Sequence, residues 1–202
     1  MDELTIHDDG SGTLKYAINL SSSRVKVNSI LALDSLDGKK VPSIDEIKAK
    51  VILFKKTLAL QNGISGVSIT ENYTDFIFKF ECNFSSVYLL QDALRKTFAI
   101  ISNDQSITQQ DFYWLSFDSK ILKRSVPSIA IDKLHKLSQN DINLLKTGSY
   151  TSISRFDRIV DNFENSLSKL SKDSKSLMIR TDTYSLKEKQ SILENTIHLF
   201  SN

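Results

Sequence analysis

The clearest pattern along the chain is an alternation of apolar and mostly polar positions over residues 76–84. The apolar members of one parity are Phe76, Phe78, Phe80, Cys82 and Phe84. Because successive side chains of a strand point to opposite faces, this pattern predicts a strand with a phenylalanine-rich face turned toward the core. A shorter alternating run over residues 67–69 and a polar turn over residues 71–75 precede it, so the two runs are predicted to form a hairpin.

A helix is predicted directly after this strand. Ser85 or Ser86 supplies the N-cap. Apolar residues then recur at helical spacing, and these are Val87, Leu90, Leu94, Phe98 and Ile101. We expect this helix to cover the phenylalanine face. The alternative for an aromatic strand is an RNA-binding sheet whose aromatic side chains stack on bases; we reject it because the glycine-containing consensus strand is absent.

Similar signals organise the rest of the first half. A hairpin is predicted over residues 4–21, with its turn in the segment Asp-Asp-Gly-Ser-Gly at residues 8–12. Residues 22–41 are predicted to form a loop or lid, either without regular structure or with one helical turn. A helix is then predicted to open on a capping box of Ser43 and Glu46 and to end at Asn62-Gly63.

The second half is predicted to continue with strands over residues 112–117, 150–160 and 177–181. One or two short helices are expected over residues 131–145, and residues 159–170 fit helical spacing ambiguously.

A last helix is predicted near the end of the chain. It is expected to open on a capping box of Ser185 and Glu188. Its apolar positions are Leu186, Leu193, Ile197 and Phe200.

This order of elements predicts an α+β fold with a largely antiparallel sheet, in which hairpins alternate with helices packed on one face. We expect one α+β domain over residues 1–202, or two sub-domains of about 1–103 and 104–202. No linker rich in proline or glycine divides the chain.

Composition restricts the class of protein. The chain has 202 residues, 40% hydrophobic residues, one cysteine and a net charge of +2, which is ordinary for a folded globule and too weakly basic to indicate nucleic-acid binding. The single Cys82 excludes a disulfide within the chain, and its parity predicts a buried thiol. No apolar run is long enough to span a bilayer, and residues 1–4 do not resemble a signal peptide. The chain is therefore either cytoplasmic or a mature domain whose leader has been removed.

The usual catalytic and metal-binding patterns are absent from the sequence. His7, His135 and His198 have no partner at metal-ligand spacing, and neither a nucleophile elbow, a dinucleotide fingerprint nor a P-loop is present. We therefore predict no catalytic residue, no metal ligand and no cofactor, and we expect the chain not to be an enzyme.

Arg155, Arg158 and Arg180 are the one polar cluster that the sequence singles out. They fall on or near neighbouring predicted strands and could meet on one sheet face to bind an anion or a partner. An ordinary salt-bridge patch is the alternative interpretation.

The stretch over residues 4–16, with its strand, Asp-Gly-Ser-Gly turn and strand, resembles the start of mature lipoproteins from the Bacteroidetes. Residues 62–67, the phenylalanine strand and residues 150–157 are similar in style to such proteins. There a leader that ends in an acylated cysteine precedes the domain; no such cysteine stands here. The resemblance is to an uncharacterised family, so it implies an envelope address and a lipid anchor but transfers no site residues.

We therefore expect a non-catalytic cell-envelope lipoprotein domain, periplasmic or attached to the outer membrane, that binds a protein partner or a lipid-like, apolar ligand between helix and sheet. It would touch the membrane only through a lipid anchor outside these 202 residues. A cytoplasmic interaction or adaptor module is the first alternative. An unrecognised enzyme acting on an anionic substrate at the arginine cluster is the second.

Overall fold

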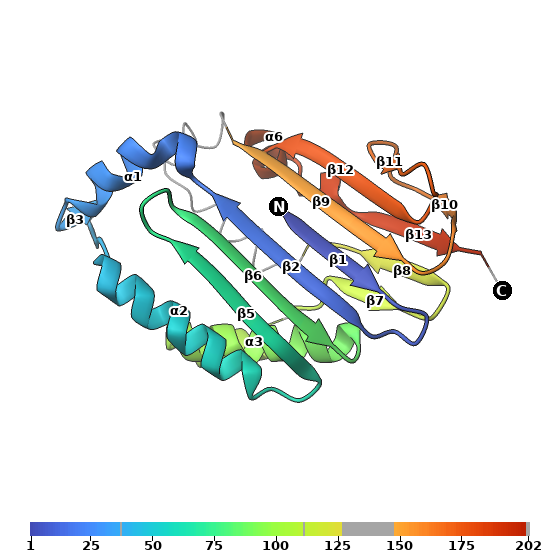
Figure 1. Ribbon diagram of the computed structural model, residues 1–202, viewed down its shortest axis with the longest axis horizontal. Coiled ribbons are helices and arrows are strands. Elements are labelled where there is room, and N and C mark those ends of the chain that lie inside the picture. The colour runs from blue at the N-terminus through green and yellow to red at the C-terminus, as the bar shows by residue number, and fades with distance from the viewer. Residues whose placement is uncertain (37, 111, 127–147, 201–202) are drawn as a thin grey trace.

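A seven-stranded sheet forms the frame of the molecule in the computed structural model, which describes residues 1–36, 38–110, 112–126 and 148–200 (Figure 1). In spatial order its strands are β11 (Lys169–Leu170), β12 (Ser176–Asp182), β9 (Ser149–Phe156), β1 (Asp2–Ile6), β2 (Gly12–Asn19), β6 (Ile77–Phe84) and β5 (Ile64–Asn72). Every pair is antiparallel except β1 and β9, which run parallel.

A second, antiparallel sheet lies behind the β12–β9–β1 half of the first (Figure 1). Its strands in spatial order are β10 (Val160–Phe163), β13 (Asn195–Leu199), β8 (Ile121–Arg124) and β7 (Leu115–Phe117). Leu122 and Ile197 from this sheet belong to the same buried cluster as Leu4, Ile6 and Phe156 of the large sheet. The two sheets therefore share one core.

Helices cover the other half of the same face. α3 (Val87–Ser102) lies behind β5 and β6, and α2 (Ile44–Ala59) runs along the β5 edge (Figure 1). Smaller elements complete the described part of the chain: η1 (Ser21–Ser23), α1 (Arg24–Leu31), the short hairpin of β3 (Ser35–Leu36) and β4 (Lys39–Lys40), η2 (Gln105–Gln109), α6 (Thr183–Glu188) and η3 (Gln190–Leu193). The predicted α+β fold, with a largely antiparallel sheet and helices packed on one face, is confirmed.

The strongest local signals produced the predicted elements. β1 and β2 form the N-terminal hairpin, and β5, β6 and α3 follow as a hairpin and helix. Ser86 caps α3 by accepting from the backbone N–H of Leu89, and Ser43 and Glu46 form the predicted capping box of α2. Cys82 and Phe84 are buried on the phenylalanine face, as expected.

The predicted last helix is wrong. Asp182, and not Ser185, caps α6 by accepting from the backbone N–H of Ser185 at 2.7 Å, and the helix ends at Glu188. Strand β13 follows, in which Asn195, Ile197 and Leu199 are buried and alternate with half-buried positions. The apolar spacing of this segment is the two-residue period of a strand, and His198 consequently lies on a strand and not near a helix end.

Three smaller expectations also need correction. Residues 22–41 contain helix α1 and the β3–β4 hairpin in place of a simple loop. Residues 159–170 contain the strands β10 and β11 and not a helix, and β8 was not predicted at all. The predicted short helices over residues 131–145, together with His135, lie outside the described residues.

The large sheet combines strands from both sides of the predicted boundary at residues 103 and 104. The first part contributes β1, β2, β5 and β6, and the second part contributes β9, β11 and β12. Within this sheet β1 is the strand that joins the two sets, because it pairs with β2 on one side and β9 on the other. How many units fold independently stays a prediction.

Candidate functional site

An apolar cavity of about 770 Å³ lies between the large sheet and the two long helices. The sheet contributes inward-facing residues of β2, β5 and β6, and these are Leu14, Tyr16, Ile18, Ile69, Phe78 and Phe80. Facing them from α2 and α3 are Ile47, Val51, Phe54, Leu94, Phe98 and Ile101. This volume falls within the roughly 300–1,000 Å³ of typical small-molecule sites.

The cavity exists because the inner face of β2 continues beyond the part that other elements bury. Leu14 is only 9% exposed, whereas Tyr16 and Ile18, on the same face of the same strand, are 39% and 43% exposed. Phe98, which lines the opposite wall, is 42% exposed. Large apolar side chains therefore face the inside of the fold without being buried by it.

A polar cluster closes one end of this cavity. Arg124 Nη1 donates to Asp2 Oδ2 at 2.8 Å and to Ser152 Oγ at 2.7 Å, and the Tyr150 hydroxyl donates to Asp2 Oδ1 at 2.6 Å. The side chains of Arg124 and Asp2 are only 10% and 8% exposed. The two charges neutralise each other, so this end of the cavity is polar without carrying a net charge.

Burial and charge shift the titration of this cluster. Burial, followed by the negative charge of Asp2, raises the pKa of Tyr150 far above its ordinary value, so its hydroxyl stays protonated and donates. Burial alone would lower the pKa of Arg124, but the neighbouring Asp2 outweighs burial and leaves that pKa raised. Arg124 therefore stays charged at any physiological pH.

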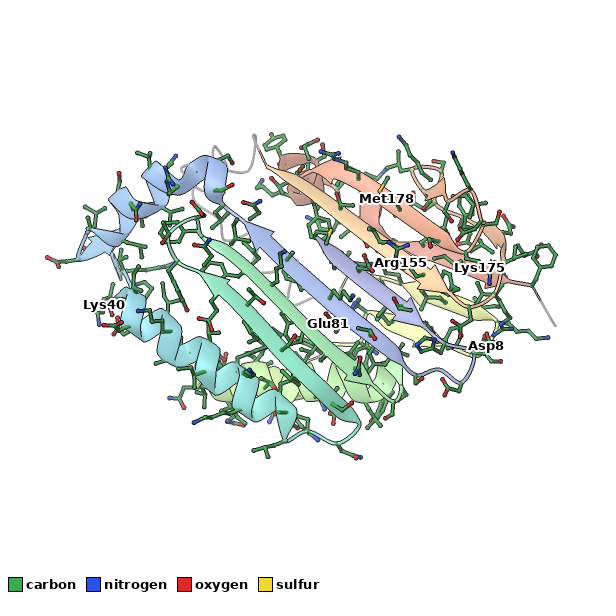
Figure 2. The ribbon with its side chains drawn as sticks, viewed as in Figure 1. Asp8, Lys40, Glu81, Arg155, Lys175 and Met178 are labelled. Atoms are coloured by element: carbon green, nitrogen blue, oxygen red, sulfur yellow. The ribbon has the colours of Figure 1, made fainter. Side chains whose placement is uncertain are left out.

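The predicted arginine cluster is distributed over three separate settings. Arg155 lies on the outer face of the large sheet, where it donates to Glu3 Oε1 at 3.1 Å and to Ser176 Oγ at 3.2 Å (Figure 2). Arg180 is opposite Thr151 on β9 and thus shares a face with Arg155, but four residues along a strand is about 13 Å. The structure does not bring the two guanidinium groups to one point.

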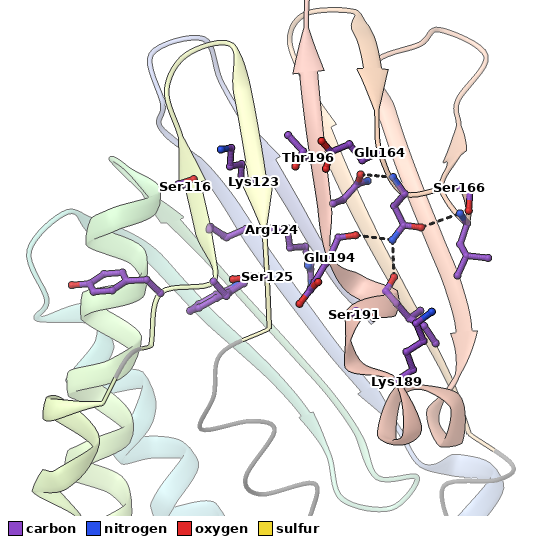
Figure 3. Close-up of a pocket in the computed structure, with 17 residues that line it drawn as sticks. Ser116, Lys123, Arg124, Ser125, Glu164, Ser166, Lys189, Ser191, Glu194 and Thr196 are labelled. Atoms are coloured by element: carbon purple, nitrogen blue, oxygen red, sulfur yellow. Dashed lines mark hydrogen bonds between the residues drawn. The ribbon is translucent and has the colours of Figure 1, made fainter.

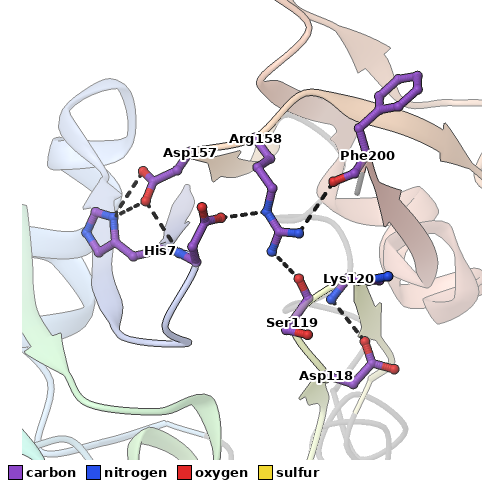
Figure 4. Close-up of polar contacts among 8 residues, drawn as sticks. His7, Asp118, Ser119, Lys120, Asp157, Arg158 and Phe200 are labelled. Carbon is purple, nitrogen blue, oxygen red and sulfur yellow. Dashed lines mark hydrogen bonds and ion pairs between the residues drawn. The ribbon is translucent and has the colours of Figure 1, made fainter. Parts of the chain in front are cut away.

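Arg158 lies in the turn after β9 and connects the two sheets. Its Nε donates to Asp8 Oδ1 at 2.6 Å, and its other nitrogens donate to the carbonyl groups of Ser119 and Phe200 (Figure 4). Beside it, His7 Nδ1 lies 3.1 Å from the carboxylate of Asp157. The anion or partner patch formed by all three arginines stays a prediction, with Arg155 and Arg158 each already paired to a carboxylate.

The described residues contain no group of three or more histidine, cysteine, aspartate or glutamate side chains placed to hold a metal ion. Cys82 is buried, and burial, with a smaller effect of Glu81, raises its pKa to about 12. That thiol is therefore protonated at neutral pH and unsuited to nucleophilic attack. The predictions of no enzyme activity and no cofactor remain untested.

The sequence analysis did not identify Asp2 and Arg124 as residues of the candidate site. Both stand at strand ends, and they are 122 positions apart. Because β8 was not predicted, nothing in the pattern placed Arg124 on the inner face of a strand. The apolar cavity itself was expected in general terms, as a space for a ligand between helix and sheet.

No helix within the described ranges is long and apolar enough to cross a membrane. No protein-family model matches the chain, and no curated protein sequence matches it.

Among solved structures, the chain is similar to the folded domain of LppM from Mycobacterium tuberculosis, determined by NMR. The TM-score is 0.41 and the sequence identity 12%, and the match covers 100% of this chain and 88% of that chain. A similarity at this level does not establish a shared function. The resemblance of residues 4–16 to lipoproteins of the Bacteroidetes stays a prediction.

Proposed function

We propose that the chain is a non-catalytic binding domain that holds the apolar chain of a lipid-like ligand in the cavity between the large sheet and helices α2 and α3. The observation that carries the proposal is an inward-facing apolar surface whose side chains stay partly exposed in the described part of the chain. Tyr16, Ile18 and Phe98 each keep about two-fifths of their surface accessible there.

The hydrophobic effect gives this surface its affinity. Removing apolar surface from water is worth roughly 25 cal/mol per Å², and a flexible acyl chain can contact both walls of a curved cavity at once. The concave shape favours such a ligand over the flat surface that a folded protein partner presents.

The ion pair at one end of the cavity is compatible with an acyl chain as the ligand. Asp2 and Arg124 are paired with each other at one end, so neither of these two groups is left as an uncompensated charge when the ligand displaces water. An ionic substrate would gain little from this neutral pair. An acyl chain that lies beside this ion pair breaks none of its hydrogen bonds.

Trp114 provides a direct test. It is the only tryptophan of the chain and lines the cavity. We expect undecanoate with a terminal bromine to quench Trp114 fluorescence in a saturable way, because bromine quenches indole only on close contact. Undecanoate without bromine should not quench but should compete.

Two isoleucine variants supply the matched comparison. Ile18 lines the cavity and is 43% exposed, whereas Ile52 on α2 is 51% exposed and is not part of the lining. Ile18→Ser should weaken binding of the brominated probe about threefold to tenfold, and Ile52→Ser should leave it unchanged. Absence of saturable quenching, or equal effects of the two variants, would overturn the proposal.

The cellular address is a separate part of the proposal. We place the domain in a cell envelope, held by a lipid anchor, on the resemblance of residues 4–16 to mature lipoproteins. The test is to grow cells with a fatty-acid analogue and ask whether the native gene product is acylated and sediments with membranes. An unlabelled product in the soluble fraction would contradict the address while leaving the cavity proposal intact.

A further inference from the structure

A second cavity, of about 710 Å³, opens where strands β8 and β13 of the second sheet end. We call it the polar groove. Its walls are the β7–β8 side, the segment over residues 164–167 and the segment over residues 189–196 (Figure 3). It differs from the apolar cavity in the chemistry of its lining, because most of its side chains carry hydroxyl, amide or charged groups.

Two asparagines hold one wall of the polar groove in place. Asn165 Nδ2 donates to the carbonyl oxygens of Ile192 and Glu194 at 2.9 and 2.7 Å, and its Oδ1 accepts from the N–H of Leu167 at 2.9 Å. Asn195 Oδ1 accepts from the N–H of Asn165 at 3.0 Å. A wall fixed by so many hydrogen bonds is preformed, so a ligand would not have to order it.

Other polar residues also line the groove. Five of them carry an aliphatic hydroxyl group, and these are Ser116, Ser125, Ser166, Ser191 and Thr196. Thr196 and Ser116 flank Lys123 in one cross-strand row of the second sheet. Each hydroxyl can donate and accept at the same time.

The charges of the groove balance. Lys123 and Lys189 are matched in number by Glu164 and Glu194, and Arg124 is neutralised by Asp2. A phosphate or another anion would meet two carboxylates here. A neutral ligand rich in hydroxyl groups would find donors and acceptors for every orientation of its own hydroxyls.

Aromatic rings complete the lining. Trp114 and Tyr113 both line the groove. Trp114 packs edge-on against Phe112, with ring centroids 5.5 Å apart, and Tyr113 stacks on Tyr88 at an interplanar angle of 10°. The Tyr113 ring is already in contact with Tyr88 and with Arg95, whose guanidinium lies 5.9 Å from the ring centroid. Trp114 is therefore the aromatic side chain of the groove that is suited to the apolar C–H face of a sugar ring.

The polar groove and the apolar cavity share a wall. Trp114, Arg124 and Ser125 line both. Leu193 of η3 lines the cavity, whereas its neighbours Ile192 and Glu194 line the groove. The two spaces are therefore adjacent, one apolar and one polar.

From these features we propose that the polar groove binds a neutral saccharide. The sugar is either a free glycan or the head of a lipid whose chain occupies the apolar cavity. The second source rests on the proposed function, and the first does not.

The experiment compares maltose, dodecyl maltoside below its micellar concentration, and the brominated undecanoate, each followed by Trp114 fluorescence and by calorimetry. Thr196→Val removes one hydroxyl from the groove and keeps the branched shape of a strand residue. Thr70→Val on β5 makes the same change at an exposed strand position away from the groove. Glu194→Gln and Glu81→Gln form a second matched pair.

We expect Thr196→Val and Glu194→Gln to weaken sugar binding about threefold to tenfold each, and their controls to leave it unchanged. If the groove variants weaken maltose binding and their controls do not, the ligand of the groove is a free saccharide. If the groove variants weaken binding of dodecyl maltoside but maltose alone does not bind, the ligand of the groove is the sugar head of a lipid. In either case binding of the brominated undecanoate should not respond to the groove variants.

The remaining outcomes separate the two proposals. If both chain-bearing probes bind but neither sugar probe responds to the groove variants, the saccharide inference falls and the proposed function stands. If maltose binds and responds while the brominated undecanoate does not bind and dodecyl maltoside binds no more tightly than maltose, the proposed function falls and the saccharide inference stands. If none of the probes binds, both fall.

Discussion

The ion pair between Arg124 and Asp2 is the most strongly buried one among the described residues, and its partners also include Tyr150 and Ser152. Replacing Arg124 with methionine would leave a carboxylate buried without its cation. We expect Arg124→Met to lower the free energy of unfolding by about 3–5 kcal/mol, measured by urea denaturation at pH 7.

The double variant Asp2→Leu with Arg124→Met provides the control. Since it removes both charges and replaces them with apolar side chains, it should recover most of the lost stability. A double variant no more stable than Arg124→Met would show that the contribution comes from packing of the arginine side chain and not from its charge.

Cys82 gives a second prediction for a single residue. Burial raises its pKa to about 12, so the protonated thiol should persist throughout the neutral and mildly alkaline range. We expect reaction with a disulfide reagent at pH 8 to occur only on unfolding, with a rate that rises with urea through the unfolding transition. Fast labelling of the native protein would contradict the buried position.

Single residues also mark the limit of reasoning from sequence. The parity of Cys82 was enough to predict its burial, because alternation is a local property. The pairing of Arg124 with Asp2 joins positions 122 apart in the chain, and such a contact depends on the register of strands that no local pattern specifies.

At the scale of elements, α2 depends on its first turn. Lys40, followed by the backbone N–H of Ser43, lowers the pKa of Glu46 to about 2 from 4.5. Since the native state holds this proton more weakly than the unfolded state, the carboxylate stabilises the fold above pH 4.5 and loses that effect as the pH falls toward 2. We expect Glu46→Gln to lower the urea midpoint at pH 7 and to have no effect at pH 2.

Ser43→Ala is the companion variant. It removes the hydroxyl that accepts from the N–H of Glu46 at 3.1 Å and should cost about 1 kcal/mol at both pH values. If Glu46→Gln behaved in the same way at both pH values, the charge of Glu46 would have no part in stabilising the helix.

The same contrast explains which elements could be predicted. α2 and α3 carry caps and a long apolar stripe in one continuous stretch, so their signals are local. β13 carries only three buried positions, Asn195, Ile197 and Leu199, whereas Leu193, Ile197 and Phe200 in the same segment fit helical spacing. Its identity as a strand comes from pairing with β8 and β10, which are remote in sequence.

At the scale of the whole molecule, β1 holds the large sheet together. It is hydrogen-bonded on both sides, to β2 and to β9. Thr5→Pro would remove a ladder hydrogen bond in this central strand and should prevent cooperative folding or cost about 3 kcal/mol or more. Circular dichroism and urea denaturation measure the effect.

Thr5→Val is the matched control, because it keeps the backbone N–H and favours a strand. It should fold with near-native stability. Wild-type-like unfolding of Thr5→Pro would mean that the two halves of the sheet do not need β1 to remain associated.

The same arrangement limits what sequence could reveal about the apolar cavity and the polar groove. The phenylalanine strand and the α3 stripe predicted an apolar space between helix and sheet. The polar groove could not be predicted, because its walls come from β7, β8, β13 and the segments over residues 164–167 and 189–194. Of these strands, β8 was not predicted and β13 was taken for a helix.

The central position of β1 has a consequence for the order of events during protein synthesis. Residues 2–6 are made about 147 residues before their parallel partner in residues 149–156. At about 5–20 residues per second, this delay lasts roughly 7–30 s. During that interval β1 can pair with β2 on one side while its other edge stays open, and an open edge invites pairing with other chains. A chain that folded during its synthesis would therefore keep this edge of β1 exposed until its last quarter has been translated.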